Sequence, residues 1–274
     1  MKKRLMAAVL STAMAATMLL TGSISVQAAD AAAANDPAVE LIFTSVSVSG
    51  DSHTEAMYEF ADKVEELSGG SVTCKCYDNG SLFSSENEFD ALLNGDADLA
   101  YISFPTIATQ IPSYSMFASG YLFSSYEHMT SVLNGDIGLN KIRPQIEETL
   151  NIKPLSSFYL GSRVINTREK EINSYDDMNG LLLRMPNSEA WLFLGEALGA
   201  NPTPLSFSEL YTALQTGAVD AQDNPLPSIE SAKFYEVTKY IAITNHVVDS
   251  IMPCINGDTW NSMTEAQQEA VTEA

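Results

Sequence analysis

The sequence predicts an α/β protein built as two lobes. Short apolar or alternating stretches, typical of strands, are followed by segments with helical spacing of apolar residues, and this alternation predicts helices packed over a mostly parallel sheet. Glycines and capping residues separate the segments. Once residues 1–28 are set aside as a leader, about 245 residues remain, enough for one large core or two smaller ones.

The first half contains three predicted strands and two predicted helices. The strands are expected at 39–46, 71–77 and 98–103, and the first helix at 52–70, where Gly69 and Gly70 end it. For the second helix, Ser85 and Glu88 have the spacing of a capping box ahead of Phe89, Leu92 and Leu93.

The second half repeats the pattern. Strands are expected at 155–160, 181–185 and 218–222. Helices are expected to begin at Ser188, at Ser206 with Glu209, and at Thr264 with Gln267, and Gly217 is expected to end the second of them.

The N-terminus has the pattern of a cleaved signal peptide over residues 1–28. Lys2, Lys3 and Arg4 precede an apolar run, and Val26-Gln27-Ala28 forms a small-residue exit. A membrane span is the alternative, but the run from Leu5 to Leu20 is shorter than the ~20 residues that a bilayer requires and contains hydroxyl residues. Because the sequence has no cysteine before Cys74, we expect export without a lipid anchor.

Composition excludes several classes of function. The chain has 14 Lys+Arg against 35 Asp+Glu, a formal charge of −21, and loss of the three basic leader residues makes it more negative. Such a chain repels nucleic acid and anionic lipid. Cys74, Cys76 and Cys254 lack C-x-x-C spacing and are interpreted as small apolar residues, and the three scattered histidines form no metal motif. We expect no cofactor and no metal.

Two arginines occur in unusual places. Arg184 ends the apolar run "GLLLR", and Arg163 follows the predicted strand at 155–160. Ligands bind at the carboxyl ends of strands in such sheets, and a planar guanidinium suits a carboxylate. The alternative is that each arginine pairs with an acid of the protein.

Longer motifs resemble those of a known family. The segment from Asn179 to His246, with "LRMPNS", "NPTPLSFSELYTALQTGAVDAQDNP" and "KFYEVTKY", is similar to the solute receptors of TRAP transporters, the tripartite ATP-independent periplasmic systems that import organic acids. Weaker similarity covers "FADKVEELSGGSV", "NGSLFSSENEFDALLNGDADLAY" and "GSRVINTREK". The resemblance implies a periplasmic-binding-protein-like fold with a hinge and a ligand cleft between the lobes.

The resemblance also implies site residues. Arg184 matches the family's carboxylate-binding arginine, Arg163 its frequent second arginine, and Asn224 an asparagine that orients the ligand. Phe207 matches an aromatic that lines the pocket in several members, with core packing as the alternative. Trp191 is interpreted as core or pocket wall.

Departures from the family bear on the ligand and on the end of the chain. Ile102 and Ser103 stand where sialic-acid receptors of the family place a glutamate, and "TSVSVSG" lacks the asparagine those receptors use. Sialic acid is therefore disfavoured and a smaller, simpler carboxylate favoured, with no residue cluster for an assisting metal. The family continues beyond Ala274, so we expect this chain to be a fragment.

We therefore expect an exported, non-enzymatic, monomeric receptor that captures a small organic acid and delivers it to a TRAP permease. Lobe I is expected to comprise 38–160 plus 250–274, and lobe II 161–249. One alternative is a sensory module that presents the same ligand to a histidine kinase. Another is a hydrolase using an acidic pair, Glu86 with Glu88 or Asp176 with Asp177, but these pairs lie at predicted helix starts, where solvated charge is the better account.

Overall fold

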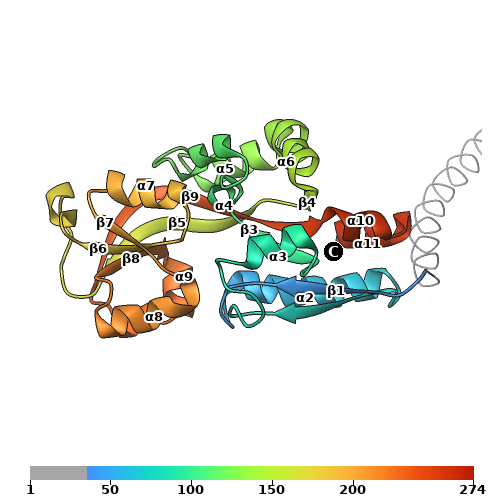
Figure 1. Ribbon diagram of the computed structural model, residues 1–274, viewed down its shortest axis with the longest axis horizontal. Coiled ribbons are helices and arrows are strands. Elements are labelled where there is room, and N and C mark those ends of the chain that lie inside the picture. Colours follow the sequence, from blue (N-terminus) through green and yellow to red (C-terminus); the bar gives the residue numbers. More distant parts are fainter. Residues whose placement is uncertain (1–35) are drawn as a thin grey trace, which may run out of the picture. The chain divides into compact units, whose positions relative to one another are not determined.

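The computed structural model describes residues 36–274, so the predicted signal peptide lies outside the described part. The strands, shown in Figure 1, are β1 (Val39–Thr44), β2 (Val72–Tyr77), β3 (Leu99–Ile102), β4 (Ile152–Pro154), β5 (Phe158–Thr167), β6 (Leu182–Met185), β7 (Asn201–Pro204), β8 (Ala221–Pro225) and β9 (Tyr240–Asn256). The α-helices are α2 (Ser52–Leu67), α3 (Glu88–Asn94), α4 (Phe104–Ile107), α5 (Tyr126–Leu133), α6 (Arg143–Leu150), α7 (Glu189–Ala197), α8 (Phe207–Thr216), α9 (Leu226–Ser231), α10 (Gly257–Ser262) and α11 (Glu265–Glu273).

The strands form one mixed sheet in the order β2-β1-β3-β9-β5-β8-β6-β7, with β4 also paired to β9. Strand β1 is parallel to β3, and β6 is parallel to both β7 and β8. The predicted mostly parallel sheet is wrong, because the 17-residue β9 runs antiparallel to β3, β4 and β5, and β5 runs antiparallel to β8. No strand was predicted at 240–256, where polar and apolar residues mix without a clear period.

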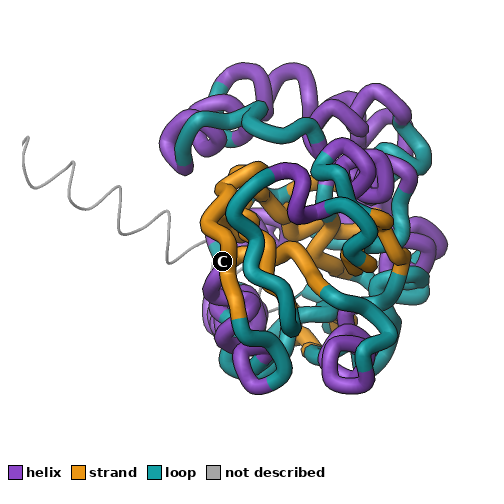
Figure 2. The backbone as a smooth tube through the Cα atoms, turned by 90° about the vertical axis from the view of Figure 1, so that its left-hand side faces the viewer, coloured by secondary structure: helices purple, strands orange, loops and turns teal. Residues whose placement is uncertain are grey.

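The two ends of this sheet have separate cores. We give each end of the sheet a name. Sheet A is the end formed by β1, β3, β4 and the C-terminal part of β9. Sheet B is the end formed by β5 to β8 and the N-terminal part of β9. Sheet A packs a cluster that includes Phe104, Met129 and Ile146, whereas sheet B packs one cluster around Trp191 and another around Leu210. In Figure 2 the strands run through the interior and the helices lie around them.

Most predicted helix boundaries are confirmed. Ser188 accepts a hydrogen bond from Trp191 N–H at the start of α7, and Gly217 ends α8 in the left-handed conformation. Thr264 and Gln267 form the predicted capping box of α11.

The capping box predicted for Ser85 and Glu88 is wrong. Helix α3 begins after Asn87, which makes no side-chain cap, and Glu88 is its buried first residue. The spacing of a serine and a glutamate three residues apart was present, but the chain enters the helix later than that spacing implies.

The described residues divide into two compact units. Unit 1 contains 36–40, Phe60–Cys74 and Met263–Ala274, and unit 2 contains Leu41–Glu59 and Lys75–Ser262. Within unit 1, the buried Gln267 side chain donates a hydrogen bond to Pro37 O at 2.8 Å, which attaches α11 to the beginning of the described chain. Both cores described above, and the cavity described below, lie in unit 2.

A bulge in β5 sets the position of Arg163. The pairing register of β5 with β9 shifts between Tyr159 and Gly161, and Gly161 has a φ of 134°. A Cβ atom at Gly161 would lie 2.4 Å from Pro225 Cβ, so glycine is required where β5 passes β8. Two residues further along β5, the Arg163 side chain is buried beside β8 and β9.

Candidate ligand-binding site

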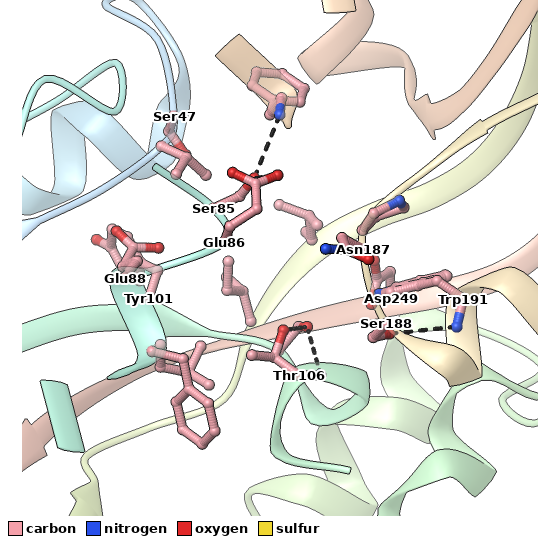
Figure 3. A pocket seen from close by; sticks show the side chains of 18 of the residues that line it. Ser47, Ser85, Glu86, Glu88, Tyr101, Thr106, Asn187, Ser188, Trp191 and Asp249 are labelled. Carbon is pink, nitrogen blue, oxygen red and sulfur yellow. Dashed lines mark hydrogen bonds between the residues drawn. The ribbon is translucent and has the colours of Figure 1, made fainter. Parts of the chain in front are cut away.

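A cavity of about 380 Å³ opens within unit 2, a size typical of sites for small molecules. Residues of both sheet A and sheet B line it, and in Figure 3 Glu86 and Glu88 lie across the drawn pocket from Asn187, Trp191 and Asp249. All four residues predicted to bind ligand line this one cavity: Arg163, Arg184, Phe207 and Asn224.

Arg184 is a buried guanidinium without an acid of its own. It lies on β6 and is 2% exposed, and its Nε donates to Leu205 O at 2.8 Å. No described residue forms a salt bridge with it or accepts a hydrogen bond from its terminal nitrogens, Nη1 and Nη2. The planar end of this side chain is therefore free to bind a group that enters the cavity.

The electrostatic surroundings of Arg184 are consistent with an unsatisfied cation. The pKa of Arg184 is lowered to about 10, mainly by burial and also by the nearby positive charge of Arg163, although Asp223 and Glu86 act to raise it. The side chain remains charged near neutral pH. A buried cation of this kind is costly to the protein until an anion pairs with it.

Arg163 is buried like Arg184, but its guanidinium is bound by carboxylates of the protein. It is 3% exposed, and its Nε and Nη2 bind both carboxylate oxygens of Asp223 at 2.7 and 3.0 Å. Its Nη1 binds Asp249 Oδ2 at 2.8 Å. Burial by itself would lower the pKa of Arg163, but the two carboxylates raise it above its usual value. Arg163 therefore pairs with acids of the protein, which was the alternative to ligand binding for both arginines.

The expectation that Arg163 occupies a loop is wrong, because it lies within β5 and is buried. Burial by itself would raise the pKa of Asp223, but Arg163 and His246 hold it well below the usual range. His246 Nε2 lies 3.2 Å from Asp223 Oδ2. Among the described residues Nη1 of Arg163 bonds to Asp249 alone, so one of its N–H groups can still point to a ligand.

Asn224 is held by its neighbours on the same wall. Its amide nitrogen donates to Gln222 Oε1 at 2.6 Å, and its oxygen accepts from Arg163 Nη2 at 3.3 Å. Gln222 in turn donates to Asn166 Oδ1 at 3.0 Å. This chain of hydrogen bonds fixes the orientation of the Asn224 amide beside the two arginines.

The aromatic residues combine packing with contact to the cations. Arg163 lies over the ring of Trp191 at 4.5 Å from its centroid, and Arg184 lies 5.9 Å from the centroid of Phe207. Phe207 also packs edge-to-face against Phe234 at 5.7 Å. Phe207 and Trp191 are therefore both core residues and pocket-wall residues. Each ring has one side in the core and one side toward an arginine.

Three acids of this region were not predicted as site residues. Asp223 and Asp249 are buried partners of Arg163, and Glu88 is a buried acid of the cavity wall, not a solvated one. The signal that singled out Arg184, a charge inside an apolar run, was also present in "HVVDSIM" around Asp249, whereas Glu88 follows a polar stretch and carried no such signal. By contrast, Asp176 is exposed, and Asp177 is half-buried in a capping box with Ser174.

Residues 36–274 contain neither a candidate metal site nor a candidate membrane span. Within that range His, Cys, Asp and Glu side chains form no group of three or more that could hold a metal ion. None of the helices described is both long and apolar enough to span a bilayer.

The architecture and this cavity are those of a two-lobed α/β solute-binding protein. Residues 43–274 match the model of the family "Bacterial extracellular solute-binding protein, family 7", and the chain belongs to that family. It is similar to the sialic acid-binding periplasmic protein SiaP of Vibrio cholerae, with 34% identity over 214 residues, 78% of this chain. The chain spans 66% of the length of that relative, just under two thirds.

Solved structures of relatives have the same fold. A TRAP periplasmic solute-binding protein from Roseobacter denitrificans with bound 3-deoxy-D-manno-oct-2-ulosonic acid is 39% identical, with a TM-score of 0.81 over 86% of this chain and 77% of that one. The sugar acid-binding protein DctPAm from Advenella mimigardefordensis, in complex with galactonate, is 29% identical, with a TM-score of 0.83 over 87% and 76% of the two chains. These likenesses confirm the predicted family and fold class.

Proposed function

We propose that this chain captures a small hydroxylated organic acid outside the cytoplasm and delivers it to a TRAP-type permease, without chemical turnover. The observation that carries the proposal is Arg184, a cation buried in the cavity wall whose terminal nitrogens have no partner among the described residues. A ligand carboxylate supplies the missing anion through two parallel N–H bonds. Arg163 adds positive charge and one N–H, and Asn224 orients the bound group.

The cavity lining favours a ligand with hydroxyl groups as well as a carboxylate. Hydroxyl and amide side chains surround the arginines: Ser47, Ser85, Ser103, Thr106, Thr109, Gln110, Asn187, Ser188, Asn224 and Ser228. Solved relatives carry acids of this kind, L-galactonate in one and β-D-glucuronate in another, whereas a third carries succinate. We propose a sugar acid, and Ile102 and Ser103 in the lining keep sialic acid disfavoured.

Binding is proposed to close the cleft. Strand β9 runs from sheet B to sheet A, and residues of both ends meet around the cavity. Phe207 N–H donates to Ser85 Oγ at 3.4 Å and Ser231 Oγ to Asp51 Oδ2 at 3.2 Å, each bond joining the two sides. The division into lobes at 38–160 plus 250–274 and 161–249 remains part of this proposal. A monomer that opens and closes about this strand would hold and release its ligand.

The proposal is tested by a thermal-shift panel of sugar acids, dicarboxylates, oxo acids and aromatic acids, followed by calorimetry on those that stabilise. A ligand at 100 times its dissociation constant stabilises by about 2.7 kcal/mol. Stabilisation by acids and not by the corresponding neutral sugars is expected. Binding of the neutral sugars with equal affinity would contradict a carboxylate site.

Delivery is tested separately, by uptake of the bound acid into vesicles that contain the TRAP permease of the same cell. Uptake that requires this protein and an ion gradient supports transport. Binding without any stimulation of uptake would favour the sensory alternative, because both functions use the same ligand contacts.

A further inference from the structure

Glu88 is a buried acid of the cavity wall, and its Oε1 has no hydrogen-bond partner among the described residues. It is 5% exposed and lines the cavity from the first turn of α3. Neither its Oε1 nor Oγ1 of the nearby Thr44, also fully buried, bonds to any residue in the range 36–274. Buried polar atoms are almost always paired in native proteins, so an unpaired carboxyl oxygen on a side chain that lines a cavity suggests that a ligand group pairs with it.

The other acids around the cavity are accounted for. Asp249 bonds to Arg163, and Asp51 bonds to His53 Nδ1 at 3.1 Å. Glu86 and Asp90, on either side of Glu88 in sequence, are exposed to solvent. Among the cavity-lining acids in the described part of the chain, Glu88 is the one that is both buried and without a counter-charge.

The chemical state of Glu88 determines what it can bind. Burial raises the pKa of Glu88 well above its usual range, and the Thr44 hydroxyl only partly opposes this. The protonated form, which is thereby favoured, has one O–H donor and one carbonyl acceptor. A ligand hydroxyl, which also donates and accepts one bond, is its natural partner.

We propose that Glu88 binds a hydroxyl group of the ligand and makes the pocket selective for hydroxylated acids. In Figure 3 Glu88 lies across the drawn pocket from Trp191, and Arg163 lies over the Trp191 ring, so a cation and Glu88 are on opposite sides of the cavity. This inference rests on the proposed function, because it requires a carboxylate at Arg184.

The unpaired carboxyl oxygen of Glu88 is expected to lower the stability of the ligand-free protein. An unpaired buried carboxyl group destabilises the empty fold, so Glu88→Leu should raise the melting temperature of the empty protein. A glutamate with a purely structural role would behave in the opposite way, because its loss would lower the melting temperature.

The test measures affinity and stability on four proteins: the wild type, Glu88→Leu, Glu88→Gln, and Glu59→Gln as a control at an exposed glutamate of α2 outside the cavity lining. The calorimetric probes are D-erythronate, galactonate, glucuronate and 3-deoxy-D-manno-oct-2-ulosonate, with succinate and adipate as acids without hydroxyl groups. Glu88→Leu should weaken the best hydroxylated probe about tenfold and leave succinate and adipate within a factor of about two. Glu88→Gln, which keeps a donor and an acceptor, should stay within about threefold of the wild type.

Each contrary outcome identifies what has failed. If the wild type binds none of these acids, the proposed function fails and the inference with it. If the wild type binds hydroxylated acids and Glu88→Leu binds them equally well, or loses all acids alike, the selectivity assigned to Glu88 is wrong while the proposed function stands. A lower melting temperature for empty Glu88→Leu also overturns the inference, because it shows that Glu88 stabilises the empty fold.

Discussion

Arg163 and Arg184 are two arginines of equal burial in one cavity, and their surroundings differ in kind. Arg163 lies between β8 and β9 and is neutralised by Asp223 and Asp249. Arg184 lies on β6 and bonds to one backbone oxygen, Leu205 O, while its terminal nitrogens have no partner in the described chain. A buried cation with its own acids is part of the architecture. A buried cation without them is, we propose, available to an external anion, so the two arginines differ in their pairing and not in their burial.

The largest expected effect is on stability, at Arg163. Arg163→Met removes the cation and leaves Asp249 buried without a counter-charge and Asp223 with His246 alone, and breaking a buried ion pair in this way typically costs about 3–5 kcal/mol. Denaturant unfolding of the empty protein should show this loss. Replacing Arg163, Asp223 and Asp249 together by apolar residues should restore most of it, and an unaltered midpoint for the single variant would show that the network is not structural.

The next effect is on affinity, at Arg184. Arg184→Lys keeps the charge and loses the two-pronged donor, so affinity for the bound acid should fall by about 2–5 kcal/mol, roughly 30- to 4,000-fold. The melting temperature of the empty protein should remain nearly the same, because no described acid pairs with Arg184. A variant that is unstable when empty but binds with wild-type affinity would reverse the roles assigned to the two arginines.

A smaller effect is expected at Phe207, whose ring lies beside the unpaired arginine and not the paired one. Phe207→Leu preserves most of the packing against Phe234 but removes the aromatic face, a cation–π contact worth about 0.5–1 kcal/mol. Affinity should fall about two- to fivefold, as measured by calorimetry. Phe234→Leu is the control, because that ring packs in the same cluster away from the cation, and an equal loss of affinity there would assign the effect to packing.

The smallest effect is the pH dependence contributed by Glu88. Its folded pKa is raised by burial, so the folded state holds this proton more tightly and Glu88 costs stability as pH rises above the unfolded value, about 4.3. The charged groups that share its cavity are Asp51, Glu86, Asp90, Asp249 and the two arginines. The melting temperature of Glu88→Gln should therefore exceed that of the wild type by more at pH 7 than at pH 5, by about 1–2 °C. A gap that is constant with pH would show that Glu88 is not titrating in this window.

Sequence patterns predicted the local elements well and their assembly less well. Caps at Ser188 and Thr264 and the stop at Gly217 are confirmed, because each depends on hydrogen bonds or backbone angles within a few residues. The mixed sheet was not predictable in the same way. The direction in which β9 meets β3 and β5 depends on pairings between residues far apart in the chain.

The sequence by itself determined that Arg184 is special, because a guanidinium at the end of an apolar strand must find an anion wherever that strand is buried. It also determined the family, since long ordered motifs depend on residue order alone, and residues 43–274 confirm it. Only the tertiary structure decided which arginine was already paired. Asp223 and Asp249 lie 60 and 86 residues from Arg163 in sequence, and only strand pairing brings their carboxylates within 3 Å of it. The Coulomb energy of two charges depends on their distance in space, which their separation along the chain does not determine.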